Sequence, residues 1–135
     1  MSEANKQTAI KFMKALCDGD VETLKSVSTK DLTAETPGTA KVCGIRSYDV
    51  IMASAAVFPL ITKEGLRVEV LNVTAEGDRV ALQWNGHSTM KDGKEYNNHY
   101  HNLFLFRDGK VSKMIEYCDL VLADAVLGPY LPPNG

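Results

Sequence analysis

Two side chains able to transfer protons, Glu116 and His87, occur on separate expected strands in the second half of the chain. Strand alternation puts Met114, Glu116 and Cys118 on one face, and Asn85 and His87 on one face of an earlier strand. Burial in a mostly apolar cavity disfavours a carboxylate and raises its pKa. Such a glutamate can accept and return a proton, and a nearby histidine can share or orient it. The pattern predicts acid–base catalysis by Glu116 and His87. The alternative is a buried structural pair, in which each side chain only supplies the hydrogen-bond partner of the other.

The expected strand between them, 95–107, supplies further polar groups. At about 3.3 Å per residue it spans roughly 43 Å, so we expect it to bend or bulge. Alternation places Asn98, Tyr100 and Asn102 on one face, followed by two phenylalanines, as in the polar wall of an apolar cavity. A core strand with satisfied amides is the alternative. The residues expected to bind substrate are Asn85, Asn98, Tyr100, Asn102, Met114 and Cys118.

Other conspicuous side chains receive structural roles. His99 and His101 have a spacing that can bind a metal, but no third ligand accompanies them, so we expect no metal site. We expect both, with Trp84, at or near a homodimer contact on the outer sheet face. Asp119 lies where the last strand ends and is expected to cap a helix.

Composition excludes several function classes. The 135 residues are 44% hydrophobic and 24% charged, with a formal net charge of −2. Since no basic cluster occurs, nucleic acid and anionic membranes are not expected partners. No apolar run approaches the about 20 residues of a membrane span, and the polar first residues are not expected to be a signal peptide. Three scattered cysteines indicate reduced thiols in a cytoplasmic protein. No phosphate loop or dinucleotide fingerprint occurs, so no cofactor is expected.

The expected elements form one domain over 1–135. Helical periodicity predicts helices over 3–17 and 21–27, and a third that starts after Ser47, runs to about Phe58 and is closed by Pro59. Alternation then predicts a meander of four strands over 66–74, 79–89, 95–107 and 111–119, with turns at Gly93 and Asp108-Gly109. An apolar helix is expected over 119–127, and a mobile tail over 132–135. Helices followed by an antiparallel sheet make an α+β fold.

Three segments carry a resemblance to a known family. They are Phe12–Asp20 with its Asp-Gly-Asp break, Thr36-Pro37-Gly38, and the run from Tyr96-x-Asn98-x-Tyr100 through Phe104-x-Phe106-x-Asp108-Gly109-Lys110-Val111 to Glu116-Tyr117-x-Asp119. The pattern resembles the SnoaL-like, ketosteroid-isomerase-like family of the nuclear transport factor 2-like superfamily. The resemblance implies a curved antiparallel sheet wrapped around a conical cavity that N-terminal helices close. It also implies a homodimer formed through the outer sheet face.

Carrying over catalytic residues gives a mixed result. The aspartate base of the steroid isomerases corresponds to Thr36, their oxyanion tyrosine to Phe12, and their protonated aspartate to Asn102. Because a threonine cannot replace a carboxylate base, steroid isomerisation by that mechanism is not expected, and Phe12 is expected only to contact substrate. In the epoxide-hydrolase branch the matching positions are Asn85, His87 and Glu116. In the polyketide cyclases of the SnoaL type they are Glu116 and Asn102.

Two functions follow from the residues and the resemblance together. The first is a cofactor-independent acid–base enzyme, of isomerase, cyclase, dehydratase or epoxide hydrolase type, acting on a small apolar molecule. The second is a ligand-binding or dimerisation module that kept the cavity and lost the chemistry. Superfamily membership alone does not choose between them, because one fold hosts many activities.

Overall fold

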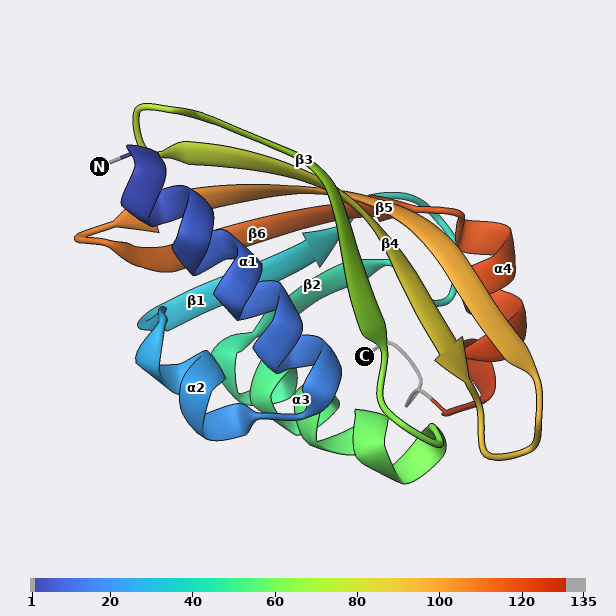
Figure 1. Ribbon diagram of the computed structural model, residues 1–135. Helices are drawn as coiled ribbons and strands as arrows, with labels where there is room; N and C mark the ends of the chain where they lie inside the picture. Colours follow the sequence, from blue (N-terminus) through green and yellow to red (C-terminus); the bar gives the residue numbers. More distant parts are fainter. Residues whose placement is uncertain (1, 131–135) are drawn as a thin grey trace.

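Residues 2–130 are described by a computed structural model, in which a curved sheet and four helices enclose one core (Figure 1). The expected tail at 132–135 lies outside the described residues. In chain order the elements are α1 (Ser2–Asp18), α2 (Val21–Ser26), β1 (Ser28–Thr36), β2 (Gly44–Ser47), α3 (Tyr48–Ile61), β3 (Arg67–Glu76), β4 (Arg79–Thr89), β5 (Glu95–Arg107), β6 (Lys110–Cys118), α4 (Leu120–Val126) and the short 3₁₀ helix η1 (Gly128–Tyr130).

The sheet has six strands in the order β2-β1-β6-β5-β4-β3. All neighbouring strands are antiparallel except β1 and β6, which run parallel. The expected meander of the last four strands is confirmed, and the sheet is mostly antiparallel. The expected irregularity in the long strand β5 is also present, because its register with β6 shifts between Leu105 and Phe106. A second shift lies in β3.

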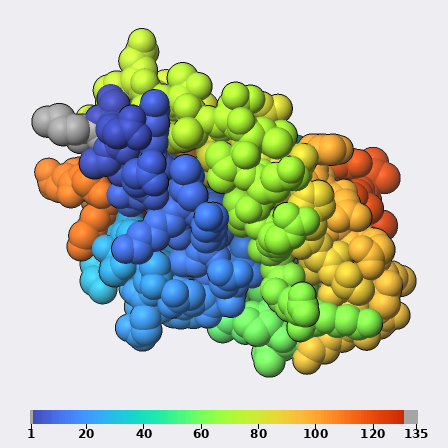
Figure 2. Space-filling model, in the orientation of Figure 1, coloured from blue at the N-terminus to red at the C-terminus, as the bar shows by residue number. Residues whose placement is uncertain are grey.

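Helix α1 packs on the inner face of the sheet against β3, β4 and β6. Phe12 of α1 also reaches β5, where its ring meets that of Phe104 edge to face with centroids 5.5 Å apart. Both rings are fully buried, so their apolar area contributes to the core. In the space-filling view α1 lies beside β3, and α2 lies below α1 on the same side of the molecule (Figure 2). The remaining part of the inner face is enclosed by α3 and α4 (Figure 1).

The ends of the elements follow local sequence signals. Asp20 caps α2 by accepting a hydrogen bond from the Thr23 amide, and Asp119 caps α4 through the amides of Val121 and Leu122. The expected cap at Asp119 is therefore confirmed. The turn between β5 and β6 has positive φ at both Asp108 (53°) and Gly109 (77°), as a two-residue hairpin requires.

The first half of the chain differs from the prediction at two points. Strands β1 and β2 were not predicted, because their 28–36 and 44–47 segments contain few large apolar residues. Helix α3 also continues through Pro59 to Ile61 instead of ending there. The Pro59 ring packs against the turn after α1: a Cβ atom on Gly19 would lie 2.5 Å from its Cγ. Gly19 also has φ +75°, a backbone conformation that favours glycine. The close Pro59 ring and the backbone conformation therefore both require a residue without a side chain at position 19.

The pairing of β4 with β5 corrects the predicted cavity wall. Asn85 lies opposite His99, His87 opposite Asn97, and Trp84 opposite Tyr100. Directly opposed residues share a sheet face, so Asn85 and His87 lie on the outer face, whereas Trp84 is inside. The prediction that Asn85 and His87 face the cavity was wrong, as was that of Trp84 at an outer contact. A difference of one residue in register moves a whole strand's side chains to the other face.

Candidate active site

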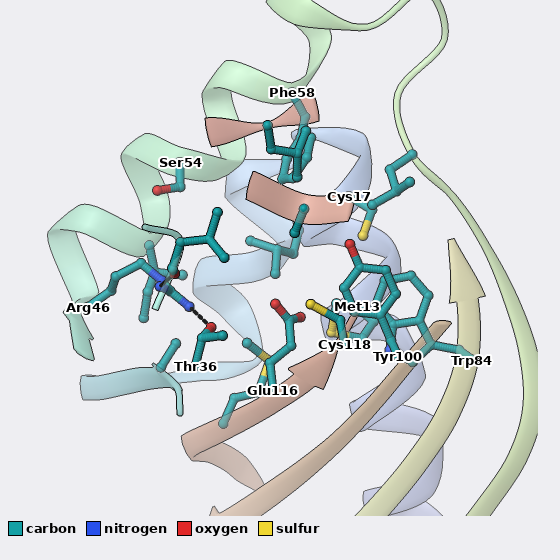
Figure 3. A pocket seen from close by; sticks show the side chains of 18 of the residues that line it. Met13, Cys17, Thr36, Arg46, Ser54, Phe58, Trp84, Tyr100, Glu116 and Cys118 are labelled. Atoms are coloured by element: carbon teal, nitrogen blue, oxygen red, sulfur yellow. Dashed lines mark hydrogen bonds between the residues drawn. The ribbon is translucent and has the colours of Figure 1, made fainter. Parts of the chain in front are cut away.

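A cavity of about 190 Å³ lies between the inner sheet face and the helices. Its wall is mostly apolar, and its polar groups come from different elements. Thr36 ends β1, Arg46 lies on β2, Tyr96 and Tyr100 lie on β5, and Glu116 lies on β6. Figure 3 shows the Glu116 carboxylate pointing into the space between Arg46 on one side and Tyr100 with Cys118 on the other.

Glu116 is the single carboxyl group among the described cavity residues, and its side chain is partly buried. Burial raises its pKa above the ordinary value; the hydrogen bond from Asn102 and the positive charge of Arg46 oppose this rise. Desolvation is the largest of the three causes, so the protonated form is favoured relative to a glutamate in water. A carboxyl group with a raised pKa holds its proton more tightly than an ordinary glutamate, which favours a role in proton transfer.

Asn102 holds the Glu116 carboxyl group from the neighbouring strand. Its Nδ2 donates to Glu116 Oε1 over 3.1 Å, and its Oδ1 accepts from the indole nitrogen of Trp84 over 2.8 Å. The indole N–H can only donate, so it determines which end of the Asn102 amide faces it. The nitrogen end therefore faces Glu116, together with the sulfur atoms of Met13 and Met114.

Arg46 lies across the cavity from Glu116 and is positioned by two acceptors. Its guanidinium donates to Thr36 Oγ1 over 2.7 Å and to the Val42 carbonyl over 3.3 Å. Val42 is fixed in turn, because its amide donates to the Asp124 carboxylate of α4 over 2.9 Å. Arg46 and Glu116 form no ion pair within the described part of the chain, so a ligand oxygen can lie between them.

Two tyrosine hydroxyls meet on the β5 side of the cavity. The Tyr96 and Tyr100 oxygens are 2.6 Å apart, and Asn98 Nδ2 donates to Tyr96 over 2.8 Å. The pKa of each tyrosine is raised, chiefly by burial, so both keep their protons. The Tyr100 ring stacks on Trp84 with centroids 4.1 Å apart.

The two cysteines in the cavity wall are not activated. Burial raises the pKa of Cys118 to about 12, and that of Cys17 is also well above its ordinary value. The nearby Glu116 carboxylate raises both further. Since the thiolate is the reactive form, neither is suited to nucleophilic attack at neutral pH.

The structure brings some predicted site residues together and separates others. Tyr100, Met114, Glu116 and Cys118 line the cavity, and Asn102 contacts two of them from behind. Phe12 was expected to contact substrate but is fully buried against Phe104 and is not among the lining residues.

Asn98 also lies behind the wall. It bonds to Tyr96 and to both backbone groups of Asp119, which ties β5 to the start of α4.

His87 belongs to a separate polar cluster on the outer face. Its Nε2 lies 2.9 Å from Glu69 Oε1 and its Nδ1 lies 2.9 Å from Asn97 Oδ1. Asn85 extends the cluster through Glu69 and His99. The pKa of Glu69 is lowered, first by the His87 hydrogen bond. Because His87 is separated from Glu116 by the sheet, the predicted catalytic pair does not exist.

Three cavity residues were not predicted from the sequence. They are Arg46, Thr36 as the acceptor that positions Arg46, and Trp84. Arg46 lies on a four-residue strand with no readable alternation, so no pattern separated it from a surface arginine. Trp84 could have been found from the register of β4, because an odd number of residues, 90–94, connects β4 to β5. That connection aligns even-numbered residues of both strands on the inner face.

A mostly antiparallel curved sheet with N-terminal helices over a cavity defines this chain as an NTF2-like α+β fold. Its sequence matches the model of the SnoaL-like domain over residues 9–114, so the chain belongs to the SnoaL-like family. None of the curated protein sequences matches it. Within residues 2–130, no helix is both long and apolar enough to cross a membrane.

Several solved structures share the fold at low sequence identity. Bal32a from a soil-derived mobile gene cassette is 23% identical, with a TM-score of 0.79 over 93% of this chain and 97% of that one. TerC, crystallised with polyporic acid, is 21% identical, with a TM-score of 0.76 over 93% and 98%. IdmH from Streptomyces antibioticus, a putative polyketide cyclase, is 20% identical, with a TM-score of 0.73 over 92% and 98%. Identities this low establish the fold alone.

Proposed function

We propose that this protein is a cofactor-independent acid–base enzyme acting on a small, largely apolar molecule, with Glu116 as the catalytic residue. The observation that carries the proposal is a lone carboxyl group of raised pKa in an apolar cavity, facing an arginine that it does not pair with. In a structural ion pair the two charged groups usually contact each other directly, whereas here a gap separates Glu116 from Arg46. Perturbed groups in clefts are frequent at functional sites.

The chemistry requires one proton acceptor and donors for a developing negative charge. Glu116 removes a proton from the ligand, and the ligand oxygen that gains charge receives hydrogen bonds from Arg46 or Tyr100. Glu116 then returns the proton to a different atom. Isomerisation, ring closure and dehydration fit this scheme, and epoxide opening fits when Glu116 activates water. A cyclase is consistent with the description of IdmH.

Steroid isomerisation with that family's usual residues is not proposed. Thr36, at the position of its base, is buried and accepts a hydrogen bond from Arg46. Phe12 is a core ring, and Asn102 is an amide held between Trp84 and Glu116. The same replacements favour the second candidate, a non-catalytic ligand-binding module, because the cavity remains while the three isomerase positions lack reactive groups.

Mass spectrometry of ligands that co-purify with the protein would name the compound class, and turnover would then separate the two candidates. Glu116→Gln keeps the side-chain volume and the acceptor for Asn102 but cannot titrate, so activity should fall by about 10²–10⁴. His87→Gln on the outer face is the matched control and should keep full activity. Equal turnover by Glu116→Gln and the unmodified protein would contradict the enzyme.

A further inference from the structure

A second apolar hollow adjoins the cavity along helix α3. This groove has a volume of about 320 Å³ and is lined by α3, the end of α4 and η1. Four residues line both the groove and the cavity: Val50, Ser54, Phe58 and Leu127. Figure 3 shows Ser54 and Phe58 on α3 above the Glu116 carboxylate. The two hollows thus adjoin, and the side chains that they share, three of them from α3, lie between them.

The groove is built for hydrocarbon. Val57, Ile61 and Tyr130 line it without contributing to the cavity, and no charged side chain occurs among its described lining residues. Ser54 and Tyr130 supply its only side-chain hydroxyls there. A surface of this kind gains free energy by removing apolar atoms from water, and offers nothing to an ionic group.

The cavity by itself is small for a ligand site. Its volume of about 190 Å³ is below the roughly 300–1,000 Å³ of typical small-molecule sites. The adjoining groove is larger than the cavity. Among the described residues that line the two hollows, the only charged ones, Glu116 and Arg46, face each other in the cavity. The space is therefore polar at one end and apolar at the other.

We propose that the ligand is an elongated molecule with one polar end and a hydrocarbon tail: the polar end lies between Glu116 and Arg46, and the tail passes Phe58 into the groove along α3. The inference rests on the proposed function only in placing the reacting atoms at Glu116. A compact ligand confined to the cavity would leave the groove exposed to water, and its affinity would be insensitive to tail length.

The test is a series of linear methyl ketones, 2-hexanone, 2-octanone and 2-decanone, which share one head and differ only in tail. Trp84 is the chain's single tryptophan and lies in the cavity wall stacked on Tyr100, so its fluorescence reports on the head. Each methylene that enters the groove should tighten binding by about two- to fourfold. Equal affinity across the series, or no saturable binding by any member, overturns the inference.

Two substitutions locate the tail. Val57→Gln places an amide in the groove. It should weaken the binding of 2-decanone at least tenfold and leave the affinity for 2-hexanone unchanged. Leu60→Gln is the matched control, because Leu60 is 68% exposed on the same helix and does not line the groove. Ala53→Phe, which fills the groove instead, should have the same selective effect. Equal losses from Val57→Gln and Leu60→Gln, or a change of oligomeric state caused by Val57→Gln, would contradict the assignment.

This test separates the inference from the proposed enzyme. The dependence on tail length should persist in Glu116→Gln, because binding of the tail requires no proton transfer. If affinity does not depend on tail length but Glu116→Gln loses turnover of the co-purified ligand as expected, the tail site alone is overturned. If affinity rises with tail length but Glu116→Gln keeps full turnover, the enzyme is overturned and the tail site stands.

Discussion

Asn102 donates its amide hydrogen to Glu116 across 3.1 Å, and this bond is oriented from the opposite side by the Trp84 indole. The arrangement joins three strands, since Trp84 lies on β4, Asn102 on β5 and Glu116 on β6. The carboxyl group is thus held by a side chain that cannot itself titrate. The positions of Glu116 and Asn102 on one inner face make this contact possible.

Asn102→Leu should destabilise the protein. Leucine fills a similar volume but leaves the buried indole N–H of Trp84 without its acceptor, which costs about 1–3 kcal/mol. Urea unfolding followed by circular dichroism measures the change. Asn72→Leu is the control, because Asn72 is exposed and bonds to Gln83 on the sheet surface. Equal small effects from both substitutions would show that the Trp84–Asn102 bond contributes little.

Glu116→Gln should change how stability depends on pH. Burial raises the folded-state pKa of Glu116 above its ordinary value of about 4.5. The folded state then binds the proton more tightly than the unfolded chain, so this group's contribution is complete below about pH 4.5 and is lost as pH rises through the folded pKa. Thermal midpoints should be similar at pH 4, with the variant more stable at pH 8. A variant less stable at pH 8 would indicate that the carboxylate is stabilised by its neighbours.

The turn at Asp108-Gly109 was predictable, but it does not by itself place Glu116. It pairs Arg107 with Lys110 and Phe106 with Val111, a register that would put Ile115 opposite Asn102. The one-residue shift between Leu105 and Phe106 puts Glu116 there instead. The family resemblance matched Glu116 and Asn102, whereas the length of the long strand predicted only an irregularity in it.

The odd-length connection over 90–94 places Trp84, and not His87, on the inner face with Tyr100, but the predicted cavity wall assigned the opposite parity to β4. Arg46 was not predictable, since its place in the cavity depends on a short edge strand and on Asp124 of α4.

Gly86→Ala should disturb the cavity wall without straining the backbone. A Cβ atom there would lie 3.0 Å from the Trp84 ring and 3.1 Å from the Tyr100 ring, so the stacked pair must move. We expect a shift in Trp84 fluorescence and weaker binding of 2-octanone. Gly128→Ala is the control, because its Cβ atom would meet its nearest neighbour at an ordinary 3.7 Å. Unchanged emission in Gly86→Ala would mean that the wall adapts.

The outer sheet face should form a homodimer. It carries Leu103 paired with Ile115, and Tyr117, 53% exposed, opposite His101. An exposed apolar surface on a sheet favours a self-complementary contact. Sedimentation velocity at micromolar concentration should show a dimer, and Tyr117→Lys should shift it toward monomer. Val121→Lys is the control, because Val121 is 83% exposed on α4 and away from this face. A wild-type monomer would contradict the prediction.

Tyr100 should be the hydrogen-bond donor to a carbonyl ligand, and Tyr96 should orient it. Tyr96 is almost fully buried and receives a hydrogen bond from Asn98, and the only acceptor that the described residues provide for its own proton is the Tyr100 oxygen. Tyr96 therefore donates to Tyr100, which leaves the Tyr100 proton directed to the cavity.

The carbonyl stretching frequency of bound 2-octanone tests this direction. A hydrogen bond from Tyr100 should lower the frequency relative to the free ketone, and Tyr100→Phe should remove most of that shift and weaken binding by about three- to tenfold. Tyr96→Phe keeps the Tyr100 hydroxyl but removes the group that polarises it, so a smaller part of the shift should be lost. Asn98 still donates to the Asp119 carbonyl over 3.1 Å in that variant, which preserves the start of α4. If Tyr96→Phe removes the shift and Tyr100→Phe does not, the order of the two hydroxyls is reversed, and Tyr96 is the group that contacts the ligand.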